Sequence, residues 1–105
     1  MKRVIQSILF FFFYSTLLFA QWTGQSSGVT NDLYDIHFED LNTGWAVGAN
    51  GKILKTINGG TNWTALTSGT TNQLNSVFFV STTYGAVVGN GGLISVTLNG
   101  GDAWF

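Results

Sequence analysis

The strongest structural signal in the chain is the stretch Thr56-Ile57-Asn58-Gly59-Gly60-Thr61-Asn62-Trp63, which returns as Thr97-Leu98-Asn99-Gly100-Gly101-Asp102-Ala103-Trp104. The final tryptophans of these stretches, together with Trp22, are spaced by 41 residues. Residues 22–62 align with residues 63–103 without a gap, and 17 of the 41 positions are identical. Chance would give only a few identities, so the chain contains a duplicated unit.

Each unit has the pattern of four short strands. From Leu33 to Phe38 the residues alternate, which places Tyr34, Ile36 and Phe38 on one face and Leu33, Asp35 and His37 on the other. The predicted strands are 33–38, 45–49, 52–57 and 63–67 in the first unit, and 74–80, 86–89 and 93–98 in the second. Neither unit has a helical stripe, and four strands in about 40–45 residues is the period of a β-propeller blade. We therefore predict an all-β chain with two four-stranded antiparallel blades, a partial β-propeller.

The repeated stretches resemble the Asp-box, or bacterial neuraminidase repeat, Ser/Thr-x-Asp-x-Gly-x-Thr/Ser-Trp. The wider unit, from Ser27-Gly28 to Asn58-Gly59-Gly60, resembles the repeat of photosystem II assembly/stability factor-like propellers. The chain departs from these patterns with Asn at 58 and 99, Ala103 where the box has a hydroxyl, and Ala86 where the first unit has Trp45. The Asn oxygen can accept backbone hydrogen bonds within a turn, so we interpret the box as structural. Its residues are Thr56, Asn58, Gly60, Trp63, Thr97, Asn99, Gly101 and Trp104.

The first twenty residues have a different character. Lys2 and Arg3 precede a nearly continuous apolar run from Val4 to Ala20, and cleavage is plausible between Ala20 and Gln21. This pattern predicts a signal peptide over residues 1–20 and a partial propeller over 21–105, with repeats at 22–62 and 63–103. A retained membrane anchor is the alternative, although 17 apolar residues are marginal for spanning a bilayer. We expect an exported protein that is periplasmic, on the cell surface or secreted, with no membrane attachment after cleavage.

Composition excludes several kinds of site. The chain has no cysteine, and residues 21–105 contain two lysines, no arginine and five carboxylates, a formal net charge of −3. This charge predicts no nucleic-acid partner. His37 is the single histidine and no Asp-x-Asp-x-Asp loop occurs, so we expect neither a metal site nor a cofactor. We interpret His37 as a residue packed between blades.

Sialidases share the Asp-box, so an enzymatic role has to be considered. Members of the sialidase family resemble one another because they share an arginine triad and a tyrosine–glutamate pair. Residues 21–105 contain Tyr34, Tyr84 and Glu39 but no arginine. Without a guanidinium fork, bidentate binding of a substrate carboxylate is lost. We interpret Glu39-Asp40 as a solvated turn. Asp32 and Asp35 could line a shared surface, but we expect them to be solvated. We predict that the chain is not an enzyme and has no catalytic residues.

The remaining candidate surface consists of the loops that enter the first and third strands of each unit. These loops are rich in hydroxyl and amide groups, which suits an unknown protein or glycan partner. The candidate residues are Asn31, Asp32, Asn50, Lys52, Asn72, Gln73 and Asn90. The alternative is a fragment of a secreted sialidase-like or other glycan-active enzyme whose catalytic blades are absent. A role in photosystem assembly rests on family analogy, and two lysines make no electropositive patch.

Two blades are fewer than the four to eight of closed propellers, and the photosystem-factor resemblance implies six or seven. Either the chain is a fragment, or identical chains assemble to complete a ring.

Overall fold

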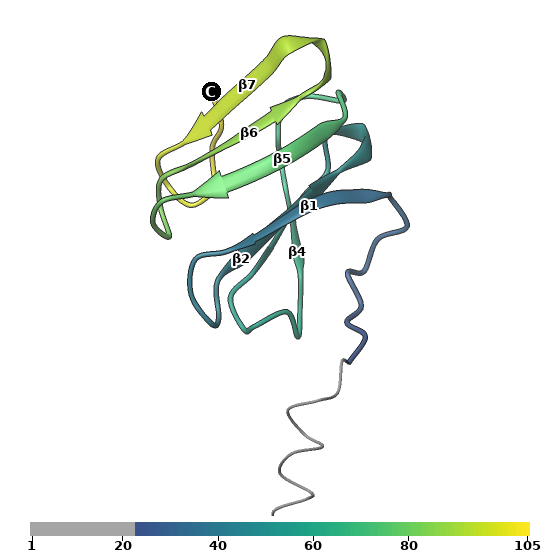
Figure 1. Cartoon of the computed structure of the whole chain (residues 1–105), viewed down its shortest axis with the longest axis vertical. Helices are drawn as coiled ribbons and strands as arrows, with labels where there is room; N and C mark the ends of the chain where they lie inside the picture. The colour runs from purple at the N-terminus through teal and green to yellow at the C-terminus, as the bar shows by residue number, and fades with distance from the viewer. Residues whose placement is uncertain (1–22) are drawn as a thin grey trace, which may run out of the picture.

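A computed structural model describes residues 23–105, which form two antiparallel sheets (Figure 1). The strands are β1 (Leu33–Phe38), β2 (Gly44–Gly48), β3 (Ile53–Thr56), β4 (Thr64–Leu66), β5 (Leu74–Phe79), β6 (Gly85–Gly89) and β7 (Leu93–Thr97). Short 3-10 turns, η1 (Ala49–Gly51) and η2 (Asn90–Gly92), connect β2 to β3 and β6 to β7. No helix in residues 23–105 is long and apolar enough to cross a membrane. The predicted signal peptide, residues 1–20, lies outside the described residues.

Each sheet follows the order of its strands in the chain, β1-β2-β3-β4 in the first blade and β5-β6-β7 in the second. The second sheet has three strands rather than the four that we expected, although Phe105 pairs with β7. The Phe105 amide donates to the Val96 oxygen at 2.9 Å, and the Val96 amide donates to Phe105 at 2.7 Å. This pairing is equivalent to that of Lys55 with Thr64 in the first blade. The predicted all-β, partial-propeller fold is confirmed.

Both inner strands contain the same irregularity. The pairing of β1 with β2 shifts between Leu33 and Asp35, and the pairing of β5 with β6 shifts between Leu74 and Ser76. Such a bulge places two residues of one strand opposite one residue of its neighbour. The strict alternation expected from Leu33 onward is therefore wrong at the start of β1.

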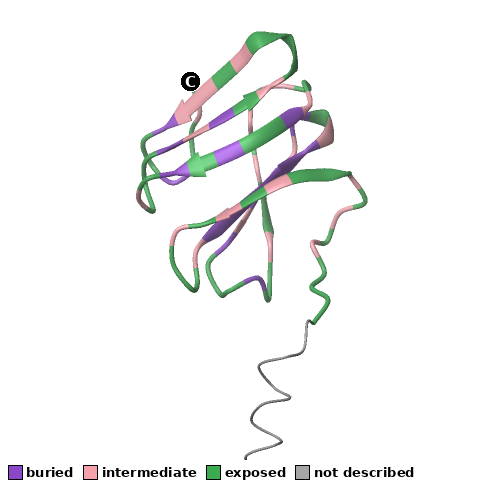
Figure 2. Ribbon diagram, viewed as in Figure 1, coloured by how far each residue is buried: buried purple, intermediate pink, exposed green. Residues whose placement is uncertain are grey.

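The core lies between the two blades. Trp45, Val47 and Ile53 of the first blade are fully buried against the second blade, whose contribution is Leu74, Val77, Phe79 and Val87. The rings of Trp45 and Phe79 stack with centroids 3.5 Å apart and planes at 4°. The Trp45 indole Nε1 also donates to the Gly100 oxygen at 3.0 Å, and this bond ties β2 to the last turn of the second blade. Figure 2 shows buried segments in β2 and β5, where the sheets face each other, and mostly intermediate burial along β7.

Candidate functional site

The turn between β3 and β4 uses its polar side chains internally. The Thr56 hydroxyl accepts a hydrogen bond from the Gly60 amide at 2.9 Å and donates to Asn58 Oδ1 at 3.0 Å. That oxygen also accepts from the Asn62 amide at 2.9 Å. The Asn58 amide group then donates to Asn62 Oδ1 at 3.0 Å, a bond that an aspartate at position 58 could not donate.

The turn that follows β7 repeats this arrangement. The Thr97 hydroxyl accepts from the Gly101 amide at 2.9 Å and donates to Asn99 Oδ1 at 2.9 Å, which accepts from the Ala103 amide at 2.9 Å. Thr97 is completely buried. These groups bond to their own turn, so the two turns serve folding and leave little polar capacity for a ligand.

The tryptophans that end the two turns cover equivalent aromatic residues. Trp63 meets Phe38 edge to face, with centroids 6.0 Å apart and planes at 83°. Trp104 meets Phe79 in the same way, at 6.1 Å and 85°. Such edge-to-face pairs add about 0.5–1.5 kcal/mol to the burial of each ring. All eight residues of the proposed box therefore have a position in their own blade.

The loop candidates gather at one end of each blade. In the first blade, the Ala49 backbone amide donates to the Asp32 backbone oxygen at 2.9 Å. The Asn31 side chain donates from Nδ2 to the Ala49 backbone oxygen at 3.4 Å. The second blade repeats both contacts. The Asn90 amide donates to the Gln73 oxygen at 2.9 Å, and Asn72 Nδ2 donates to the Asn90 oxygen at 3.1 Å. The structure thus brings each strand-entry loop against the 3-10 turn of the same blade.

The second blade carries a feature that the first blade lacks, a linked set of side-chain amides that we call the amide cluster (Gln73, Asn75 and Asn90). Gln73 Nε2 donates to Asn75 Oδ1 at 2.8 Å, and Asn75 Nδ2 donates to Asn90 Oδ1 at 2.9 Å. Asn75 and Asn90 are exposed. Sequence reasoning missed Asn75 because it lies within a predicted strand. The sequence feature that could have identified Asn75 is its position two residues after Gln73.

The two remaining candidates, Asn50 and Lys52, line a different part of this surface. With Ser68 and Thr70 they border an open hollow of about 630 Å³ between η1 and the connection from β4 to β5. Gly51 is buried here with a φ of +69°, and a Cβ at this position would overlap the Thr70 carbonyl oxygen. The glycine therefore allows η1 to pack closely under the loop that leads to the second blade.

Asp35 is partly buried and bonds to the second blade, whereas the sequence suggested a solvated side chain. Its Oδ2 accepts hydrogen bonds from the Ser76 hydroxyl at 3.0 Å and from the Val77 amide at 2.9 Å, both on β5 of the second blade. Its Oδ1 accepts from the Ile36 amide at 2.9 Å. Burial alone raises the pKa of Asp35, but the hydrogen bonds from Val77, Ser76 and Ile36 outweigh it and hold the pKa below its ordinary value. Asp35 thus connects the blades, and the expectation failed because alignment of the repeats does not show which residues touch.

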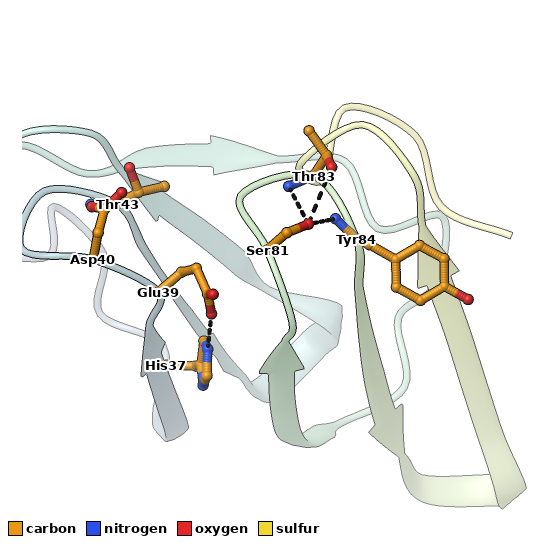
Figure 3. Close-up of polar contacts among 7 residues, drawn as sticks. All are labelled: His37, Glu39, Asp40, Thr43, Ser81, Thr83 and Tyr84. Atoms are coloured by element: carbon orange, nitrogen blue, oxygen red, sulfur yellow. Dashed lines mark hydrogen bonds and ion pairs between the residues drawn. The ribbon is translucent and has the colours of Figure 1, made fainter.

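The opposite end of the blades carries two short turns that share one design (Figure 3). Asp40 Oδ1 accepts from the Thr43 amide at 2.7 Å and the Asn42 amide at 2.8 Å, and these bonds hold the pKa of this carboxyl below its ordinary value. In the second blade the Ser81 hydroxyl takes the same role and accepts from the Tyr84 amide at 3.1 Å. The Glu39-Asp40 segment is therefore a turn, as its sequence suggested.

The residues weighed for catalysis are not assembled at this end. Half-buried His37 lies 3.2 Å from Glu39, measured from Nε2 to Oε2, and its ring centroid is 5.0 Å from that of Phe78 on the second blade. Figure 3 shows the Tyr84 ring pointing away from the His37–Glu39 pair. Within residues 23–105, no three His, Cys, Asp or Glu side chains lie close enough to hold a metal ion.

Comparison with known proteins points to one family. The family model described as "Photosynthesis system II assembly factor YCF48" matches residues 15–105. Among solved structures, one described as "YCF48 bound to D1 peptide" is 30% identical over 75% of this chain, with a TM-score of 0.68. YCF48 from Cyanidioschyzon merolae is 24% identical over 79% of this chain, with a TM-score of 0.67, and supports the fold alone. No protein among those with curated descriptions matches the chain.

The chain spans only 27% and 28% of the lengths of these two solved proteins.

Proposed function

The chain belongs to the photosynthesis system II assembly factor YCF48 family, and from this premise we propose that it is a non-catalytic propeller module that binds a protein segment. The observation that carries the proposal is the bound peptide in the 30% identical relative described as "YCF48 bound to D1 peptide". The proposal is made for this chain by similarity, because the chain corresponds to about a quarter of that protein.

The amide cluster supports a peptide as the ligand. Each side-chain amide has a carbonyl that accepts and an NH₂ group that donates, so it can pair with both groups of a peptide unit. Among residues 23–105, the Gln73 oxygen and the Asn90 NH₂ group have no hydrogen-bond partner at the two ends of the cluster. These free groups suit an extended peptide backbone that passes over the start of β5.

The charge of this surface restricts the peptide. Asp32 and Lys52 are the charged side chains in the loops at this end, and they have opposite signs. Neither a strongly acidic nor a strongly basic peptide gains much electrostatic binding energy from such a surface. We therefore propose a weakly charged, extended peptide that is recognised through its backbone.

The test is a titration of a fluorescently labelled D1 peptide with the purified chain, measured by fluorescence anisotropy. Asn75→Ala should weaken binding about 3- to 10-fold, because it removes the central hydrogen bonds of the amide cluster. Asn42→Ala, in the turn between β1 and β2, is the matched control and should leave binding unchanged. Absence of saturable binding by the wild-type chain, or equal affinities of the two variants, would refute the proposed site.

Glycan binding and a glycan-active enzyme are the competing functions. A glycan array with the same protein distinguishes glycan binding from peptide binding. A glycan signal without peptide binding would favour glycan binding over the proposed function. The second would place its positively charged grip on an acidic sugar in blades outside residues 21–105, which contain no arginine, and arginines together with a tyrosine–glutamate pair in such blades would favour it.

We also propose that the chain is exported, on the basis of Lys2, Arg3 and the apolar run from Val4 to Ala20. Mass spectrometry of the chain produced in a bacterial host should find a mature form that begins at Gln21 outside the cytoplasm. An intact chain of 105 residues in the membrane fraction would show a retained anchor instead.

A further inference from the structure

The chain contains four asparagine–glycine pairs, and the structure restrains three of them more than the fourth. In a flexible peptide such a pair is prone to spontaneous deamidation, because glycine has no Cβ to shield its amide nitrogen from the preceding side chain. The Asn side chain and that nitrogen must approach each other, so hydrogen bonds on either group oppose the reaction. The pairs are Asn50-Gly51, Asn58-Gly59, Asn90-Gly91 and Asn99-Gly100.

The pairs in the turns that follow β3 and β7 are held at both reacting groups. The Oδ1 atoms of Asn58 and Asn99 each accept two hydrogen bonds from their own turn. The Gly59 amide donates to the Asn42 oxygen at 2.9 Å, and the Gly100 amide donates at 2.8 Å to a backbone oxygen in the turn between β5 and β6. Hydrogen bonds on the side chain and on the attacking nitrogen must therefore break before either pair can react.

The pair in η1 is restrained by packing. Gly51 is buried, and a Cβ at this position would overlap the Thr70 carbonyl oxygen. The nitrogen that would attack the Asn50 side chain therefore belongs to a residue with little room to move.

The pair in η2 has neither restraint. Asn90 and Gly91 are exposed, and among residues 23–105 no group accepts a hydrogen bond from the Gly91 amide. The Asn90 side chain accepts a single hydrogen bond, from the exposed Asn75. The backbone bonds of Asn90 to Gln73 and Asn72 involve neither reacting group.

The difference between η1 and η2 is a shift of one residue. Gly91 is the repeat equivalent of Asn50, which precedes the packed glycine of η1. Asn50 is exposed, and within residues 23–105 its amide has no acceptor, although the next blade is in place beside η1. The exposure of the Gly91 nitrogen therefore follows from its position in the turn.

We propose that Asn90 is a site of spontaneous deamidation and that this modification lowers the affinity of the amide cluster for a peptide. The Gly91 amide nitrogen loses its proton to water and attacks Cγ of Asn90. A bond forms between these two atoms, the bond from Cγ to Nδ2 breaks, and Nδ2 leaves as ammonia. Water then opens the resulting succinimide ring and gives aspartate or isoaspartate at position 90.

The product changes what the amide cluster offers to a peptide. The NH₂ group of Asn90 is the unpaired donor at one end of the cluster within residues 23–105. In the product a carboxylate replaces it, which can only accept hydrogen bonds and repels a backbone oxygen. The expected loss of affinity rests on the proposed function, whereas the modification itself does not.

Mass spectrometry of the purified full chain, incubated in mildly alkaline buffer made with heavy-oxygen water, tests the site. Each deamidation incorporates one heavy oxygen, so peptides taken at successive times give a rate for each asparagine. Asn90 should react at least about 5-fold faster than Asn58 and Asn99, the factor that one broken hydrogen bond contributes. It should also react faster than Asn50. An equal or higher rate at any of these three would overturn the proposal.

The chain unfolded in urea is the control for the effect of the fold. All four pairs should then react at similar rates, and a preference for Asn90 that persists would refute the structural explanation. Gly91→Ala should slow the reaction in the folded chain, because a Cβ shields the nitrogen. This turn accommodates a side chain there, since the equivalent Asn50 has a φ of +58°. Circular dichroism verifies that the variant is folded.

Fluorescence anisotropy with the labelled D1 peptide tests the effect on the amide cluster. Asn90→Asp and the incubated wild-type chain should both bind about 3- to 10-fold more weakly than the fresh chain. Asn99→Asp is the matched control, because it adds the same charge in a turn outside the cluster, and it should bind like the wild type. Unchanged affinity after modification of Asn90 would overturn the effect on the cluster. A fresh chain that binds no peptide would contradict the proposed function alone, because the reaction rates are measured without peptide.

Discussion

Replacement of Trp45 by alanine should cost more stability than any other single truncation between the blades. The side chain is fully buried, stacks on Phe79 at 3.5 Å and donates from Nε1 to the Gly100 oxygen at 3.0 Å. Truncating a buried tryptophan costs about 3–5 kcal/mol. Of this, the hydrogen bond accounts for about 1 kcal/mol and the ring pairing for about 0.5–1.5 kcal/mol. The remainder comes from lost apolar burial and the cavity.

Trp45→Phe separates these contributions. A phenyl ring keeps a stacking partner for Phe79 but removes the indole N–H and leaves the buried Gly100 oxygen without that donor. We expect a loss of about 2 kcal/mol, near half of the loss in Trp45→Ala. The phenylalanine variant also gives a graded result if the alanine variant does not fold.

Urea unfolding followed by far-UV circular dichroism measures both losses. With slopes of about 1–3 kcal/mol/M for small proteins, Trp45→Ala should lower the midpoint by roughly 2 M. Tyr84→Ala removes a half-exposed aromatic ring and should cost below about 0.5 kcal/mol. A loss of less than about 1 kcal/mol for Trp45→Ala would refute the view that this residue holds the blades together.

Three further predictions concern other contacts. Because the pKa of Asp35 is lowered in the folded chain, its stabilisation is complete above the unfolded pKa of about 3.9 and is lost as the pH falls toward the folded pKa. Urea midpoints of Asp35→Asn should therefore fall less between pH 6 and pH 3 than those of the wild type. Thr97→Val should cost about 1–3 kcal/mol, because it leaves the buried Gly101 amide without its acceptor. Gly51→Ala should cost more than about 1 kcal/mol, measured by thermal unfolding, because its φ is +69° and its Cβ would overlap the Thr70 oxygen.

Matched controls exist for all three. Asp32→Asn alters an exposed carboxylate outside the bonds from Asp35 to β5 and is the control variant for Asp35→Asn. Thr61→Val lies at an exposed position in the turn between β3 and β4 and should cost below about 0.5 kcal/mol. Gly69→Ala has a φ of +79° but open space around it, so it isolates backbone strain from overlap. Equal losses at Gly51 and Gly69 would contradict the role given to the Thr70 contact.

Much of the fold could be predicted because the repeat and the strand pattern agree. The strand expected at 33–38 is β1 (Leu33–Phe38), and the boundaries of the other strands differ from those expected by at most one residue. The bulge at Leu33 and Asp35 could not be predicted. A bulge depends on the register in which β1 pairs with β2, and the residue composition of either strand alone does not determine that register.

The candidate site was harder to predict for a similar reason. The loop residues were found because turn-forming residues enter both inner strands, but Asn75 and Asp35 lie in strands where alternation assigns only a face. Asp35 bonds to Ser76, its own repeat equivalent 41 residues later. Alignment of the repeats places these two residues at the same position of the unit, whereas in the structure they are in contact. The alignment that reveals the repeat therefore cannot show this contact.

The self-contained hydrogen bonding of the two threonine–asparagine turns has a consequence for how such a chain evolves. A duplication of 41 codons adds a turn whose threonine and asparagine side chains need no partner from another blade, because Thr97 and Asn99 satisfy their own turn just as Thr56 and Asn58 do. Adaptation is required only where a new unit meets its neighbours. The copies have diverged there, at Trp45 and Ala86, Asp35 and Ser76, and His37 and Phe78. Newly duplicated blades of this type can therefore be retained first, and the substitutions that fit each blade to its neighbours can follow afterwards.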